Sequence, residues 1–127
     1  MPRSPLLSRI VTVVLRVRDR LEAVEWYRDH FDLRHVLDDP SSGISVLELA
    51  SGDSVTLWVA TSEEMIAPGD MAGTVPVFES FDAHAHHRAL TARGIRTSPI
   101  SEAPGLRSFS FWDLDDNRLE IWQVRDE

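Results

Sequence analysis

The sequence predicts an α+β fold built from two βαβββ modules, and three observations support this prediction. Strand-like and helix-like patterns follow one another in the order β-α-β-β-β, and the same order then recurs. Asp19 and Asp82 are the residues placed to begin the two helices, and Asp32 and Gly94 lie near the helix ends. The separation in sequence between the two helix starts is nearly equal to the separation between the two helix ends. The 127-residue chain therefore contains an internal repeat of half its length.

Module 1, at about residues 9–60, begins with a strand at residues 10–17, which are rich in β-branched side chains. Asp19 stands where a helix N-cap belongs. The next apolar residues follow at spacings of three and four, which predicts a helix of about three turns: Leu21, Val24, Tyr27 and Phe31. Turn-forming residues then separate three predicted strands, at about residues 33–38, 44–50 and 54–60.

Residues 61–73 contain Pro68 and Gly69 and have no clear period, so we expect them to form a linker. Module 2, at about residues 74–124, repeats the pattern of module 1. A strand at residues 74–79 precedes a helix that begins after Asp82 and runs through Arg93, with Gly94 placed to end it. Three more strands are predicted, of which the last two form a hairpin, at residues 95–100, 108–112 and 118–124.

Composition excludes several classes of function. The length fits one small domain, residues 1–127. There is no cysteine, which excludes disulfides, thiolate zinc sites and a cysteine nucleophile. A net charge of −8 opposes binding to nucleic-acid phosphates. No apolar run approaches the roughly 20 residues of a membrane helix, and the N-terminus lacks the apolar core of a signal peptide. We therefore expect a cytoplasmic protein without nucleic-acid or membrane partners.

Three segments resemble one known superfamily. Residues 17–31 place an Asp between a strand and a helix that carries Trp26-Tyr27, and residues 89–94 are similar to the end of the superfamily's second helix. Residues 109–121 resemble its closing hairpin, with Asp113-Leu114-Asp115-Asp116-Asn117 followed by Leu119-Glu120-Ile121. On these residues the chain, over about residues 9–124, resembles the vicinal oxygen chelate superfamily, which includes glyoxalase I, bleomycin-resistance proteins and extradiol dioxygenases.

The resemblance implies an architecture as well as a topology. The sheets of the two modules are expected to curl into a U-shaped trough, with the helices on the outer face, and the protein is expected to form a homodimer. Three residues depart from the superfamily pattern: Leu114 replaces a Pro, and Asp116 and Asp32 each replace a Gly. Asp tolerates a left-handed backbone better than most residues, so we expect these turns to form.

Metalloenzymes of this superfamily take a His, Glu or Gln ligand from the first and last strand of each module. The matching positions here are Thr12, Thr56, Pro76 and Glu120, and the spacing from position 12 to 76 equals the spacing from 56 to 120. Only Glu120 is a strong metal donor, so we expect no metal, with Glu120 as the ligand if one divalent metal is present. Without a metal, Glu120 is a hydrated or paired carboxylate, a general base, or a counter-charge for a cationic ligand.

Strand alternation predicts which other side chains share the trough. Arg16 matches the arginine that binds a glutathione carboxylate in glyoxalase I relatives. The tryptophans either form a stacking wall for a flat or cationic ligand or fill a core or dimer interface. The candidate ligand-binding residues are Thr12, Arg16, Thr56, Trp58, Trp112, Arg118, Glu120 and Trp122.

Two other patterns carry no predicted function. His84, His86 and His87 are expected on a solvated helix face, and His30 and His35 on the surface. Residues 113–117 imitate the start of a calcium-binding EF-hand loop, but Arg118 and Val124 stand where that loop needs Gly and Glu.

The sequence therefore leads to one main hypothesis and one alternative. The main hypothesis is a metal-independent small-molecule binding protein of the glyoxalase/bleomycin-resistance type, which sequesters an aromatic or cationic metabolite or antibiotic. The alternative is a metal-dependent lyase, isomerase or dioxygenase of the same superfamily, with Glu120 as ligand or base. The sequence leaves open whether the protein is an enzyme.

Overall fold

The computed structural model describes residues 6–60 and 74–125, so the predicted linker at 61–73 lies outside the described residues. The chain divides into two compact units. Among the described residues, these units correspond to module 1 and module 2, except that Arg16–Arg18 group with the second unit. No helix in the described part of the chain is long and apolar enough to cross a membrane.

The strands of module 1 form one four-stranded sheet in the order β1-β4-β3-β2. β2 pairs antiparallel with β3, and β3 pairs antiparallel with β4. The first and last strands of the βαβββ unit are therefore neighbours. The elements are β1 (Val13–Val17), α1 (Arg20–Phe31), β2 (Arg34–Asp39), β3 (Ile44–Glu48) and β4 (Ser54–Val59).

Module 2 has the same topology, with the strand order β5-β8-β7-β6. β5 runs parallel to β8, and β8 and β7 form the predicted hairpin. The two four-stranded sheets and two helices confirm the predicted α+β class with two βαβββ modules. The elements are β5 (Val77–Glu79), α2 (Ala83–Ala92), β6 (Ser101–Ala103), β7 (Leu106–Trp112) and β8 (Arg118–Val124).

One strand prediction in module 2 is wrong. Residues 95–100 make only an isolated bridge, between Thr97 and Phe111. Pro99 has no backbone N–H to donate to a ladder, so the pairing with β7 is interrupted there. The strand that borders β7 is instead Ser101–Ala103, which lies between the strands predicted at 95–100 and 108–112.

Both predicted helix starts are confirmed by their caps. The Asp19 carboxylate accepts a hydrogen bond from the backbone N–H of Glu22 at 3.0 Å, and Asp82 caps α2 in the same way. α1 ends at Asp32, which adopts a left-handed backbone with φ 55°, and Gly94 has φ 79° after α2. Asp32 thus adopts the left-handed backbone that ends the helix, at a position where the superfamily pattern has Gly.

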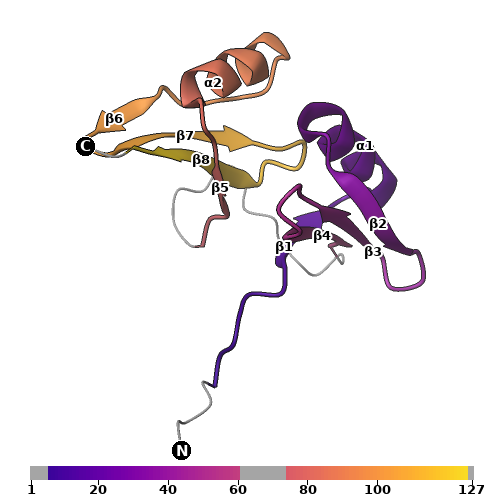
Figure 1. The fold of residues 1–127 in the computed structure, drawn as a ribbon. Coiled ribbons are helices and arrows are strands. Elements are labelled where there is room, and N and C mark those ends of the chain that lie inside the picture. The colour runs from indigo at the N-terminus through magenta and orange to yellow at the C-terminus, as the bar shows by residue number, and fades with distance from the viewer. Residues whose placement is uncertain (1–5, 61–73, 126–127) are drawn as a thin grey trace, which may run out of the picture. The chain divides into compact units, whose positions relative to one another are not determined.

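Each helix covers one face of its own sheet, as Figure 1 shows. α1 contacts β2, β3 and β4, and α2 contacts β7 and β8. Alternate side chains of the strands are buried on that face, where each large apolar side chain contributes about 1.5–3 kcal/mol. Within residues 6–60 and 74–125, the other face carries no helix of the same module. The buried strand residues include Leu47, Val55 and Leu57 in module 1, and Phe109, Phe111, Leu119 and Ile121 in module 2.

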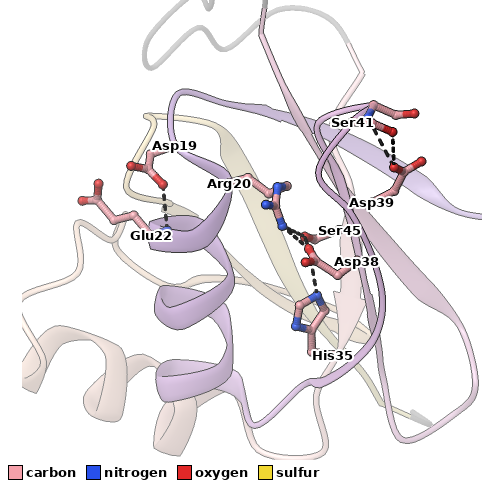
Figure 2. A network of polar contacts seen from close by, with 9 residues as sticks. Asp19, Arg20, Glu22, His35, Asp38, Asp39, Ser41 and Ser45 are labelled. Atoms are coloured by element: carbon pink, nitrogen blue, oxygen red, sulfur yellow. Dashed lines mark hydrogen bonds and ion pairs between the residues drawn. The ribbon is translucent and has the colours of Figure 1, made fainter.

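A polar network ties the start of α1 to its sheet (Figure 2). Arg20 pairs with the Asp38 carboxylate and donates to Ser45 Oγ at 3.0 Å. Ser45 is fully buried, and its hydroxyl donates to Asp38 at 2.7 Å. His35 Nε2 lies 3.7 Å from the same carboxylate. A buried hydroxyl needs hydrogen-bond partners, so this network fixes the position at which the start of α1 packs on the sheet.

The turn between β7 and β8 depends on two aspartates. Asp113 is 5% exposed, and its carboxylate accepts hydrogen bonds from the backbone N–H groups of Asp115 and Asn117, each at 2.9 Å. Asp116 has a left-handed backbone with φ 63°. The expectation that Asp would support this turn in place of Gly is confirmed.

We predict that the backbone of Asp116 sets its tolerance to substitution. Asp116→Val should lower the free energy of unfolding by about 1–2 kcal/mol, because a β-branched residue is strained in the left-handed region. Asp116→Gly, the matched control, should change stability by less than about 0.5 kcal/mol. Urea denaturation measures both values, and equal stability of the two variants would contradict the prediction.

Candidate ligand-binding site

The four positions that match metal ligands lie together in pairs, one pair within each module. In module 1, the hydroxyl oxygens of Thr12 and Thr56 are 3.0 Å apart. In module 2, the backbone N–H of Glu120 donates to the carbonyl oxygen of Pro76 at 2.9 Å. In each pair, one residue directly precedes the first strand of its module and the other lies in the last strand, as the internal repeat requires.

The module 1 pair belongs to a cluster of hydroxyl groups. Ser54 Oγ donates to Thr12 Oγ1 at 2.8 Å, and Thr12 Oγ1 donates to the carbonyl oxygen of Ser54 at 3.1 Å. Thr56 is 7% exposed. The three hydroxyls satisfy one another, which is what buried polar groups require. The cluster is neutral and supplies no strong ligand for a cation.

Glu120, in module 2, uses both of its carboxylate oxygens in hydrogen bonds. Oε2 accepts from Nη2 of Arg118 at 2.5 Å, and Oε1 accepts from the indole Nε1–H of Trp122 at 2.8 Å. The side chains of Arg118 and Glu120 are 13% and 19% exposed. Because both side chains are mostly buried, water screens their attraction only weakly. The positive charge of Arg118 therefore balances the negative charge of Glu120.

These residues do not fit a divalent metal. A metal site needs several strong protein donors, and the matching positions offer two hydroxyls, a proline and one carboxylate. The guanidinium of Arg118, bonded to that carboxylate, would also repel a cation placed there. Elsewhere in residues 6–60 and 74–125, no group of three His, Asp or Glu side chains could hold a metal ion.

Trp58 and Trp122 occupy equivalent positions in the repeat. Each follows one of the matched positions, 56 and 120, at the same distance along its strand. Trp58 is 37% exposed and Trp122 is 38% exposed. Their neighbours along the strands, Leu57 and Ile121, are buried, so both indoles lie on the sheet faces that carry no helix of their own module. Each module thus presents one half-exposed indole from its last strand, on its helix-free face.

Trp112 differs from the other two candidate tryptophans. It is 7% exposed, and the guanidinium carbon of Arg96 lies 4.0 Å from the centroid of its ring. Its backbone N–H donates to the carbonyl of Arg96 at 3.1 Å. Arg96 is not among the residues predicted from the sequence, because no periodicity relates a residue after α2 to the end of β7. A direct role for Trp112 in binding stays a prediction.

The two arginines of the candidate set have different surroundings. Arg16 is half-buried, and its carbonyl oxygen accepts from Asn117 Nδ2 at 2.9 Å. Arg118 donates from Nε to Ser110 Oγ at 3.1 Å besides its bond to Glu120. Sequence alternation correctly places Arg118, Glu120 and Trp122 on one face. A role for Arg16 in binding a carboxylate stays a prediction.

The histidines of α2 make contacts within module 2. His84 Nε2 lies 3.0 Å from Glu102 Oε1, and His86 Nδ1 lies 2.6 Å from Ser80 Oγ. His87 is half-buried: its Nε2 lies 2.9 Å from the carbonyl oxygen of Ser98, and its ring is perpendicular to that of Phe109, with 5.0 Å between the two ring centroids. The expectation of a wholly solvated histidine face is therefore wrong for His87, because α2 packs on β7.

Comparisons with known proteins identify the fold. No family model matches the sequence, and no curated protein matches it. Among solved structures, the chain is similar to a glyoxylase/bleomycin resistance protein/dioxygenase domain from Frankia sp. EAN1pec, with 21% identity, a TM-score of 0.77, and 94% of each chain covered.

Two further solved structures are similar over nearly their whole length. TnmS3, an antibiotic binding protein from Streptomyces sp. CB03234, has 20% identity and a TM-score of 0.76, with 96% of this chain and 100% of that chain covered. The fosfomycin resistance protein FosX from Listeria monocytogenes has 16% identity and a TM-score of 0.76, with coverages of 94% and 96%. The chain thus has the fold of the vicinal oxygen chelate superfamily, as its resemblance implied.

We predict that Glu102 stabilises module 2 in a pH-dependent way. Hydrogen bonds from His84 and from Arg107 hold the pKa of this exposed carboxylate below its usual 4.5. A pKa that is lower in the folded state gives stability that is present above pH 4.5 and is lost as the pH falls through the lowered value. Glu102→Gln should therefore lower the Tm slightly at neutral pH and leave it unchanged in strong acid. A Tm difference that persists in strong acid would contradict this.

Proposed function

We propose that this protein is a metal-independent small-molecule binding protein that sequesters an aromatic or cationic compound, a metabolite or an antibiotic. One observation carries the proposal: the equivalent, half-exposed indoles of Trp58 and Trp122 on the helix-free faces of the two sheets. These indoles offer apolar ring surface on each helix-free face, and a ligand that covers such surface gains free energy from its burial.

The chemistry of these indoles supports a flat or cationic ligand. Indole rings stack on aromatic molecules and attract cations over their faces, with about 0.5–1.5 kcal/mol per aromatic contact beyond burial of area. A protein can sequester a ligand with such surfaces and a few polar groups, and it needs no catalytic residues to do so. The hydroxyl cluster of Thr12, Ser54 and Thr56 and the Arg118–Glu120 pair supply polar groups on the same faces.

The donor set and the similar structures support the same proposal. Thr12, Thr56 and Pro76 give a metal no strong ligand, and Arg118 neutralises Glu120. TnmS3 is an antibiotic binding protein, and FosX is a fosfomycin resistance protein. An antibiotic is therefore one reasonable ligand class for this chain.

Calorimetric titration of tryptophan variants tests the proposal. The probes are acridine and phenazine, which are planar and aromatic. Trp58→Ala and Trp122→Ala should each weaken binding about tenfold, because each removes one stacking surface. Trp26→Phe is the matched control, since Trp26 lies on α1 with its ring 4.9 Å from that of Tyr27. This control should bind like the unmodified protein.

Two results would contradict the proposal. One is that neither planar probe binds the unmodified protein. The other is that both probes bind but Trp58→Ala and Trp122→Ala keep full affinity, which would place any ligand away from the helix-free faces.

A further inference from the structure

Four side chains of module 2 form a continuous row of hydrogen bonds on the helix-free face. The row begins at Ser110 on β7, whose Oγ accepts from Arg118 Nε at 3.1 Å. It continues from Arg118 Nη2 to Glu120 Oε2 at 2.5 Å, and ends with Trp122 Nε1 donating to Glu120 Oε1 at 2.8 Å. The strand register explains the row, because Ser110 lies opposite Glu120 across the hairpin.

The row is anchored at its buried end and open at its exposed end. Ser110 is 6% exposed, while Trp122 is 38% exposed. The Arg118–Glu120 pair between them is mostly buried, so its charge-assisted hydrogen bonds are strong and restrict the carboxylate to one orientation. A carboxylate held in this way in turn restricts the indole that donates to it.

We infer that Glu120 is a positioning residue for Trp122, held in place by Arg118. At the position where metalloenzymes of this fold have a ligand, this chain has a side chain that fixes the orientation of a binding surface. The inference rests on the proposed function, since it assigns Trp122 a ligand to stack on. A ring that is already ordered loses less conformational entropy when the ligand binds.

The same geometry narrows the role of Glu120 in recognition. Both carboxylate oxygens are engaged by partners on this face, Arg118 and Trp122. A cation brought to Glu120 would meet the guanidinium of Arg118, which repels it. The ligand class assigned to this part of the site is therefore a planar aromatic group on the face of the Trp122 ring, rather than a cation bound by Glu120.

The direct test follows the indole Nε1 proton of Trp122 in the ¹⁵N-labelled full chain by NMR, with the signal assigned through Trp122→Phe. In the unmodified protein this proton should resonate downfield and exchange slowly with solvent, because it is hydrogen-bonded to a carboxylate. Glu120→Ala should move the signal upfield and speed its exchange. Glu120→Gln, which keeps an acceptor oxygen, should restore both readouts in part.

Binding of acridine is measured on the same variants. Glu120→Ala should weaken it about two- to tenfold, because the ring must then be ordered on binding. Glu79→Gln is the matched control: Glu79 lies in register with Trp122 on β5 and is exposed, so its loss removes a carboxylate from the same face. This control should change neither the indole signal nor the affinity.

The outcomes separate this inference from the proposed function. An indole signal that Glu120→Ala leaves unchanged would overturn the positioning role, and so would a changed signal with unchanged acridine affinity. In both cases, weaker binding by Trp122→Ala would leave the proposed function standing. If Glu120→Ala does not fold, Arg118→Gln replaces it, with faster indole exchange expected and unchanged exchange overturning the inference.

Discussion

A single helix per module can cover only one face of its sheet, and this constraint shapes the rest of the structure. Side chains that alternate along β4 and β8 divide into a buried set under the helix and a second set on the opposite face. The buried set is apolar, as in any small domain. In the second set, polar side chains bond to one another, and the two modules use different groups for this. Module 1 uses neutral hydroxyls, whereas module 2 uses an ion pair.

The internal repeat makes this divergence visible. Thr56 and Glu120 are equivalent positions with unlike chemistry, while Trp58 and Trp122 are equivalent positions with the same residue. A metal site would need strong donors at positions 12, 56, 76 and 120, and only one donor is present. What the two modules share is an indole on each helix-free face. The function proposed here follows from that shared feature.

Local patterns in the sequence were enough to predict most of the fold. The caps at Asp19 and Asp82 and the order of strands depend on short-range hydrogen bonding and alternation, which a sequence displays directly. The same alternation placed Arg118, Glu120 and Trp122 on one face. Residues 95–100 were misassigned because their apolar ends resemble a strand, although Pro99 interrupts the ladder.

Contacts between distant residues were beyond such patterns. Arg96 contacts Trp112 because the chain after α2 passes beside the end of β7, and the alternation of side chains does not predict this contact. Alternation also gives the face of a side chain but not its rotamer, so the bond from Trp122 to Glu120 was not foreseen. The trough, the homodimer and the cytoplasmic location stay predictions.

Metal analysis of untagged protein, purified without chelator, tests the central claim of metal independence most directly. After incubation with iron, manganese, nickel or zinc and removal of excess ions, we predict less than about a tenth of a metal ion per chain. About one tightly held ion per chain, lost in Glu120→Ala, would contradict it and favour a metal-dependent enzyme.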